Sequence, residues 1–204
     1  MKKVIYKFFV FCFFVPVSFR YIYKWPVFLK NKMARLRKFC AYRRLDRPYT
    51  RKSKYRNLSY IKTSPNIKIV RFEGGNLKRE FPARVDLVSR EPLQIRHNAI
   101  ESARLTANRY LEKKVGKHEF RLSIRMYPHH VLRENPLAAG AGADRMSTGM
   151  KRSFGKAIGK AAQVWVGKPV LSVYVEKKHA DSAKKALLRA SKKFPGTYTV
   201  QIHS

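Results

Sequence analysis

Acidic residues are scarce in this sequence. Only 12 Asp and Glu stand against 46 Lys and Arg in 204 residues, which gives a formal net charge of +34. Hydrolysis needs paired carboxylates or a nucleophile with its base. The acids nearest the glycine-rich middle of the chain, Glu134 and Asp144, both have basic neighbours within a few residues, and we interpret them as salt-bridged structural acids. The sequence therefore predicts no catalytic residue and no enzymatic activity.

Cysteine is scarce as well. Cys12 and Cys40 lie far apart, and neither has a Cys or His at the spacing of metal ligands. The sequence therefore indicates neither a disulfide framework nor a zinc site, and it favours a reducing compartment. We expect no metal and no other cofactor.

Long apolar runs are also missing. Phe8 to Val17 follows a short basic start, as in a signal peptide, but it is shorter than the roughly 20 apolar residues that span a bilayer. No A-x-A cleavage site follows this run. Larger residues occupy the positions at which a signal-peptide cleavage site has small residues. Residues 1–32 therefore allow three interpretations: translation that truly starts at Met33, a genuine N-terminal extension, or a targeting signal.

The excess of positive charge makes a polyanion the expected partner. Like charges at this density repel one another in a compact fold, so a bound polyanion stabilises the folded state. Nucleic acid is the first candidate and a membrane surface the second. The 45% apolar and 13% aromatic content supplies enough material for one modest core. We therefore expect one domain with basic arms.

Residues 33–64 have the composition of a nucleic-acid-binding arm. Residues 33–56 hold ten basic residues and one acid, with Tyr42, Tyr49 and Tyr55 interleaved. The cations can neutralise phosphates and the tyrosines can stack on unpaired bases, so we favour an arm that becomes ordered on RNA over a solvated tail. The predicted RNA-binding residues of the arm are Arg35, Arg37, Lys38, Arg43, Arg44, Arg47, Arg51, Lys52, Lys54 and Arg56.

Alternation of apolar and polar residues predicts strands in the domain of residues 65–204. In residues 119–127 the apolar side chains from Phe120 to Met126 form one face, and Arg121 and Arg125 lie on the other. The apolar face is expected in the core, while the two arginines are expected to contact phosphate. The other predicted strands are residues 66–72, 81–89, 161–168, 169–177 and 197–203, with a turn at Gly74-Gly75-Asn76.

Two segments have helical spacing. The first predicts an amphipathic helix of about 20 residues that starts near Pro92 and stops before Gly116. Its inward positions recur every four residues and are Ile95, Ala99, Ala103, Ala107 and Leu111. The second covers residues 180–193 and stops at Pro195-Gly196, and its inward positions are Ala183, Leu187 and Ala190.

Most of residues 127–160 has neither helical nor strand periodicity. Compact domains rarely carry loops longer than about 12–15 residues unless the loop binds something or is disordered. Five glycines allow its backbone to approach a partner closely. We therefore predict that residues 128–160 form a loop that contacts a phosphate-rich surface. Its predicted binding residues are Arg133, Arg145, Lys151, Arg152, Lys156 and Lys160.

Known nucleotide-binding motifs do not account for these glycines. Arg145 occupies the third glycine position of a dinucleotide fingerprint, and neither Gly155-Lys156 nor Gly167-Lys168 is followed by the Ser or Thr of a P-loop. His129 and His130 are adjacent, so their side chains point apart in an extended segment, and no carboxylate or cysteine joins them. We interpret both as packing or RNA-contact residues. A nuclease that uses them is the alternative.

Four segments carry a resemblance to a known family. They are RPYTRK at 47–52, FPARVDLVSREPLQIRHNAIESARLTANRYL at 81–111, FRLSIRMYPHHVLRENPLAAGAGADRMSTGMKRSFGK at 120–156 and KKFPGTYTVQIH at 192–203. They closely resemble the archaeal form of the large-subunit ribosomal protein family named L-sixteen in bacteria and L-ten-e in archaea and eukaryotes. The resemblance covers residues 33–204, and the loop is its most specific part. Residues 1–32 have no counterpart.

The resemblance implies an α+β fold, a mixed sheet with two helices in a hammerhead-like sandwich, seated in rRNA. It implies a structural constituent of the large subunit of cytoplasmic ribosomes that helps to position A-site tRNA. The loop from Arg133 to Arg152 would point towards the peptidyl transferase centre. The implied partners are large-subunit rRNA, A-site tRNA and neighbouring ribosomal proteins, with no small-molecule substrate and no homo-oligomer. The alternative is a secreted or membrane-associated cationic protein directed by residues 1–20.

Overall fold

The computed structural model describes residues 37–50, 54–61, 63–138, 140, 142, 147 and 149–203, apart from the side chains of Arg56 and Arg152. All of these except Arg37 belong to one compact unit, residues 38–204. The boundary predicted at Met33 lies outside the described residues. In chain order the elements are the short 3-10 turns η1 (Phe39–Tyr42) and η2 (Arg56–Leu58), β1 (Glu73–Gly75), β2 (Ala83–Ser89), β3 (Leu93–Arg96), α1 (His97–Lys114), β4 (Phe120–Ile124), β5 (His130–Glu134), η3 (Met150–Arg152), β6 (Lys156–Val164), β7 (Pro169–Val175), η4 (Lys177–His179), α3 (Ala180–Ser191) and β8 (Tyr198–His203).

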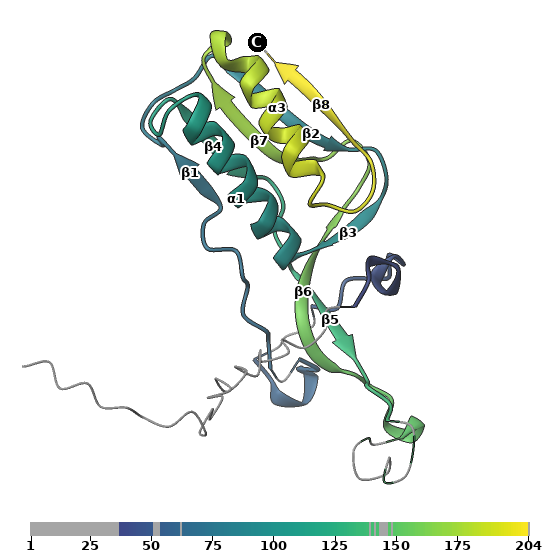
Figure 1. Cartoon of the computed structure of the whole chain (residues 1–204). Coiled ribbons are helices and arrows are strands. Elements are labelled where there is room, and N and C mark those ends of the chain that lie inside the picture. Colours follow the sequence, from purple (N-terminus) through teal and green to yellow (C-terminus); the bar gives the residue numbers. More distant parts are fainter. Residues whose placement is uncertain are drawn as a thin grey trace, which may run out of the picture. The chain divides into compact units, whose positions relative to one another are not determined.

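A five-stranded sheet in the order β1-β4-β7-β2-β8 carries α1 and α3 on one face (Figure 1). This arrangement confirms the α+β fold with two helices. The expected mixed sheet is wrong for the described strands, because every pairing in it is antiparallel. β2 and β4 run in the same direction, but β7 lies between them and pairs with both. The insertion of β7 therefore prevents a parallel pair.

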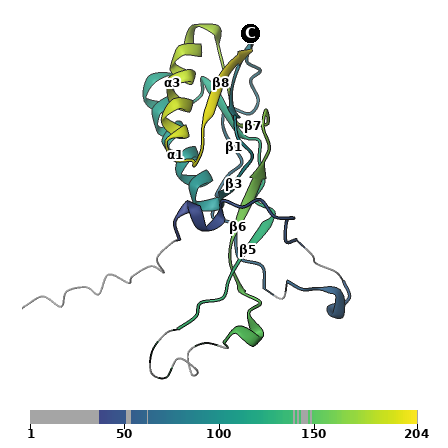
Figure 2. The same ribbon diagram turned by 90° about the vertical axis from the view of Figure 1, so that its right-hand side faces the viewer.

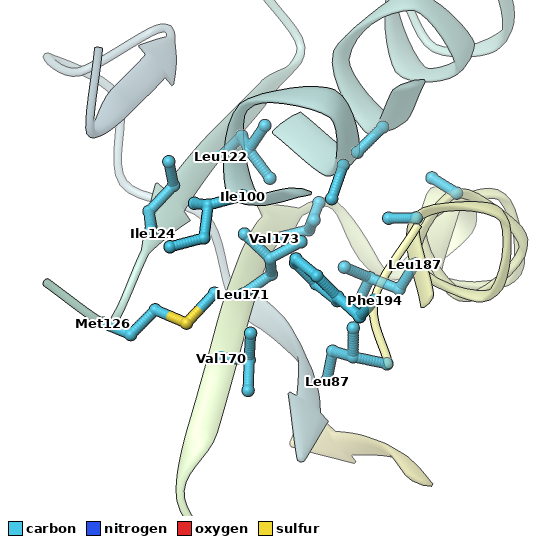
Figure 3. Close-up of a cluster of buried hydrophobic side chains, with 14 of the residues drawn as sticks. Leu87, Ile100, Leu122, Ile124, Met126, Val170, Leu171, Val173, Leu187 and Phe194 are labelled. Atoms are coloured by element: carbon cyan, nitrogen blue, oxygen red, sulfur yellow. The ribbon is translucent and has the colours of Figure 1, made fainter. Parts of the chain in front are cut away.

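The core lies between this sheet and the two helices. The alternation predicted for β4 is confirmed, since Leu122, Ile124 and Met126 are at most 8% exposed. Ile100 of α1 and Leu187 of α3 join the same cluster (Figure 3). Removal of this apolar surface from water is the main force that holds the helices on the sheet.

The first helix begins later than predicted. Pro92 precedes a separate short strand, β3, and the helix starts only at His97. Arg96 is both the last residue of β3 and the N-cap of α1, so no turn separates the two elements in the sequence. The end before Gly116 is confirmed, with this glycine at φ +118°. The buried positions of α1 are His97, Ile100, Ala103, Ala107 and Leu111.

The strand predicted for residues 66–72 is wrong. Ile69 is buried, as the alternation indicated, but the backbone N–H groups of Lys68 and Val70 donate to side chains of α1. Their acceptors are His97 Nδ1 and Glu101 Oε2, each at 3.3 Å. Because a helix takes up these donors, no strand ladder forms before β1. Gly74 and Gly75, predicted as a turn, belong to β1 itself.

The remaining predictions hold within a few residues. Residues 81–89, 161–168, 169–177 and 197–203 correspond to β2, the end of β6, β7 and β8. The helix predicted from residue 180 is α3, and Ala183, Leu187 and Ala190 are fully buried in it. Gly167, between β6 and β7, has φ +76°, a conformation that favours glycine at this turn.

A second, three-stranded sheet has the order β3-β6-β5 (Figures 1 and 2). The end of β6 pairs with β3, and the beginning of β6 pairs antiparallel with β5. Residues 127–160 are therefore not a continuous loop: β5 and the start of β6 form a hairpin whose loop is residues 135–155. The sequence did not indicate these strands, because Arg133 and Lys156 interrupt their apolar pattern.

Candidate nucleic-acid interface

Residues 42–49 of the basic arm lie on the three-stranded sheet. Tyr49 N–H donates to His130 Nδ1 at 2.7 Å, and Tyr49 C=O accepts from Val131 N–H at 3.1 Å. Gln94 Nε2 donates to the carbonyls of Tyr42 and Arg44, at 2.5 and 3.2 Å. The sheet thus binds the backbone of this part of the arm, whereas we expected an arm that becomes ordered on RNA.

The tyrosines of the arm differ in their surroundings. Arg96 lies over the ring of Tyr42 at 5.3 Å, and Arg133 lies over the ring of Tyr49 at 4.3 Å. These arginines of the chain occupy ring faces that we had proposed for RNA bases. Tyr55 is 61% exposed, with Lys54 at 5.1 Å from its ring centroid.

Arg133 lies against two aromatic rings. Its Cζ lies 4.3 Å from the ring centroid of Tyr49 and 4.4 Å from that of Phe154. The two rings meet edge to face, with centroids 5.8 Å apart. No carboxylate of the described residues forms an ion pair with Arg133. A guanidinium next to aromatic rings still has N–H donors for an anion, and its planar fork of donors matches a phosphate in geometry.

A β-bulge precedes this arginine in the ladder. Leu132 pairs with Gly159 but Arg133 pairs with Ala157, so Ile158 has no partner in the ladder. Bulges change the direction of side chains along a strand and recur at binding sites. Beyond the bulge the two strands of the hairpin approach each other closely. A Cβ on Gly155 would be 2.8 Å from the Glu134 backbone.

Two hollows flank Tyr49. The first, of about 670 Å³, lies between the arm and the small sheet and is lined by Arg44, Arg47 and His130 among others. The second, of about 810 Å³, is lined by Phe154 and Lys156. Tyr49, Tyr60 and Arg133 line both. The structure therefore places cations of the arm and of the hairpin around the aromatic residues Tyr49 and Tyr60.

The predicted site residues fall into three groups. Ten side chains are exposed: Arg37, Lys38, Arg43, Arg44, Arg47, Lys54, Arg125, Arg133, Lys151 and Lys156. Arg121 and Lys160 are half-buried. Arg35, Arg51, Lys52 and Arg145, and the side chains of Arg56 and Arg152, lie outside the described structure.

Arg121 of β4 and Arg125, which follows this strand, do not line the two hollows around Tyr49. Arg121 Nη2 donates to Glu73 Oε1 at 3.0 Å, and its guanidinium lies 5.6 Å from the ring centroid of Tyr174. Arg121 is therefore engaged within the protein, although we predicted a phosphate contact. Arg125 is exposed, and its side chain has no ion pair among the described residues.

Two histidines favour the neutral state. Burial, and then the charges of His129 and Arg133, lower the pKa of His130, while Asp46 opposes this effect. Burial, and then Lys68, Lys160 and Arg96, lower the pKa of His97. His129 is exposed, and its Nδ1 lies 3.0 Å from the carbonyl of Tyr127. His130 is thus a packing residue, as one of the two interpretations proposed.

Sequence reasoning missed Gln94, Tyr60 and Phe154. An amphipathic pattern gives no sign that Gln94, 5% exposed in a short strand, would bind the arm. Phe154 and Tyr60 carried a weak signal, since each stands close to cations in the sequence. Both are more than half exposed, and exposed aromatic surface is typical of interaction sites.

Among the described residues, no cluster of His, Cys, Asp or Glu has the arrangement of a metal site. No helix there is both long and apolar enough for a membrane span.

Comparison with known proteins decides the family. Residues 46–201 match the family model described as ribosomal protein L16p/L10e. The chain belongs to the ribosomal protein L16p/L10e family. It is similar to the large ribosomal subunit protein uL16 of Methanocella arvoryzae, with 48% identity over 148 residues, which are 72% of this chain and 86% of the relative.

Other archaeal relatives of the same name are similarly close. The uL16 protein of Staphylothermus marinus is 51% identical over 148 residues, 72% of this chain and 82% of the relative. That of Archaeoglobus fulgidus is 45% identical over 154 residues, 76% of this chain and 85% of the relative. L16p/L10e membership makes the chain a structural protein of the ribosome that acts in translation, not an enzyme, and assigns it to the cytoplasmic ribosome. The secreted alternative draws on residues 1–20, which lie outside both the match and the described structure.

Proposed function

We propose that the chain binds large-subunit rRNA through its arm and hairpin and helps to position A-site tRNA near the peptidyl transferase centre. The observation that carries this proposal is the grouping of exposed cations from both segments. Arg44 and Arg47 of the arm line the same hollow as Arg133 of the hairpin, with only one acid, Asp46, beside them. Phosphate is the ligand that such a group prefers.

The ion pairs of the chain leave these cations largely available. Arg44 pairs with Asp46 at 3.0 Å, but both side chains are more than two thirds exposed, and such pairs contribute only about 0–1 kcal/mol. The better-buried pairs lie elsewhere, such as Arg104 with Glu101 on α1 and Arg84 with Asp86 on β2. Released counterions therefore supply the driving force for binding, and the affinity should fall steeply with salt.

The hairpin suits the tRNA-positioning role because a paired neck supports its loop. The β5–β6 ladder runs as far as Glu134 and Lys156, so the connection between the two strands starts from a hydrogen-bonded base. Met150 is 71% exposed and Lys151 is exposed near the tip of this hairpin. A basic connection on a paired stem can reach into a crowded RNA centre while the sheet stays outside.

Directed hydroxyl-radical cleavage tests the proposal. An iron chelate is attached to a cysteine at Met150, in a chain that carries Cys12→Ser and Cys40→Ser and has been assembled into large subunits. We expect cleavage of peptidyl-transferase rRNA and of bound A-site tRNA. A cysteine at Leu105, exposed on α1, is the matched control and should cleave neither. Cleavage of distant rRNA from position 150, with A-site tRNA intact, would refute the tRNA-positioning role.

A further inference from the structure

The second hollow, the one lined by Phe154 and Lys156, has features beyond the positive charge that attracts RNA in general. Its volume, about 810 Å³, lies within the range of sites that enclose a small ligand. It is formed by three separate segments: the arm up to Thr63, β5 at Arg133, and the hairpin from Phe154 to Ala157. No Asp or Glu is among its lining residues. A ligand there would be anionic or neutral.

Aromatic surface forms much of its wall. Tyr60 is 52% exposed and Phe154 is 60% exposed, and both line the hollow. Tyr49 OH donates to the Tyr60 carbonyl at 3.0 Å, which connects the arm residues on the two sides. Exposed aromatic rings in a recess are a stacking surface for flat ligands, because stacking removes their faces from water.

Cations stand beside this surface. The guanidinium of Arg133 lies against the rings of Tyr49 and Phe154, so the positive charge stands at the hollow beside the aromatic surface. Lys156 is exposed at the same hollow. Asn57 and Thr63 add uncharged donors and acceptors to the lining. Flat aromatic walls, an arginine beside them and neutral polar groups together match the base, phosphate and base edge of one nucleotide.

We propose that this hollow binds a single unpaired nucleotide extruded from rRNA. Its base would stack against Tyr60 and Phe154, and its phosphate would lie on Arg133 and Lys156. An acidic peptide would satisfy the cations, but it would leave the aromatic walls without a flat partner. The inference rests on the proposed rRNA binding and names the RNA feature that is recognised.

Binding of the full-length chain to three RNA hairpins tests this inference. One hairpin is perfectly paired, one carries a single bulged adenosine, and one carries an abasic bulge at the same position. We expect the bulged adenosine to bind roughly five- to a hundredfold more tightly than the abasic bulge, the factor typical of base stacking. Tyr60→Ala should abolish this preference and Tyr60→Phe should retain it. Trp165→Ala, an exposed aromatic control outside the hollow, should leave it unchanged.

The outcomes separate the two proposals. Equal affinity for the adenosine and abasic bulges, or a preference that survives Tyr60→Ala, would overturn the nucleotide site and leave rRNA binding intact. A chain that binds none of the three hairpins would contradict the proposed function itself. A photo-crosslinker placed at Tyr60 in assembled subunits gives a further readout. Attachment to a nucleotide would support the site, and attachment to a neighbouring protein would overturn it.

Discussion

Tyr49 and His130 are joined by a hydrogen bond of 2.7 Å in which the backbone N–H of the tyrosine donates to Nδ1 of the histidine ring. The bond connects the arm to the first residue of β5, 81 positions further along the chain. It requires an unprotonated Nδ1, because a protonated imidazole has only donors. The attachment of the arm is therefore linked to the charge of one histidine.

Acidification should loosen the arm. The pKa of His130 is lowered, chiefly by burial, so the docked arm favours the neutral ring. Because the docked state has the lower pKa, docking is fully stable at a pH above the ordinary histidine pKa of about 6.5. This stability is lost as the pH falls below about 6.5. Hydrogen exchange at the Tyr49 amide, corrected for its intrinsic pH dependence, should show protection at pH 7.5 that declines towards pH 5.5.

Two variants control this prediction. His130→Gln keeps an acceptor without a titratable ring, so protection of Tyr49 should depend less on pH. His129→Gln changes the exposed neighbour and should preserve the wild-type pH dependence. Protection that is constant across the range in the wild-type chain would contradict the linkage.

Replacement of Gln94 should release the N-terminal side of the arm. Gln94→Leu removes both donors to the Tyr42 and Arg44 carbonyls, a loss of about 1–3 kcal/mol of docking free energy if these groups stay buried. Trypsin should then cleave faster after Arg43 and Arg44, while the thermal transition of the core is retained. Gln163→Leu is the matched control, because its single bond to the Asp46 carbonyl is exposed and its loss should cost less.

A side chain at Gly155 should displace the hairpin tip. In Gly155→Ala the new Cβ would stand 2.8 Å from the backbone N and C of Glu134, and backbone atoms of a paired strand cannot move aside cheaply. We expect cleavage from a chelate at position 150 to shift to other nucleotides. Gly142→Ala is the control. A Cβ at Gly142 would have no atom within 4 Å, and its φ of +78° should strain only its own loop. An unchanged cleavage pattern in Gly155→Ala would count against a rigid neck.

Loss of charge at the hairpin should weaken RNA binding more than folding. We expect the triple change of Arg145, Lys151 and Arg152 to Ala to flatten the plot of log K against log salt, by roughly 0.7–0.9 for each phosphate that is no longer neutralised. Translation by subunits that contain it should fall, and the unfolding transition should persist. The control changes Lys184, Lys185 and Lys192 to Ala, three exposed cations of α3 and its end. Equal salt slopes for both variants would refute a special role for the loop cations.

The sequence by itself determined the elements whose signal is local. β4 and α3 were predictable because alternation or helical spacing follows directly from which side chains must be buried. β3 and β5 were not, since four or five residues carry little periodicity and their pairing with β6 depends on segments far along the chain. The net charge, and with it the preference for a polyanion, also follows from composition alone.

Only the tertiary structure decided which groups meet. Folding of β7 between β2 and β4 makes the pairings antiparallel, and no local pattern encodes that order. Arg133, Tyr49 and Phe154 come from three separate segments, and a cation that contacts both rings exists only once the hairpin and arm lie together. Sequence fixes the chemistry of each side chain, whereas chain packing sets the distances at which that chemistry becomes a site.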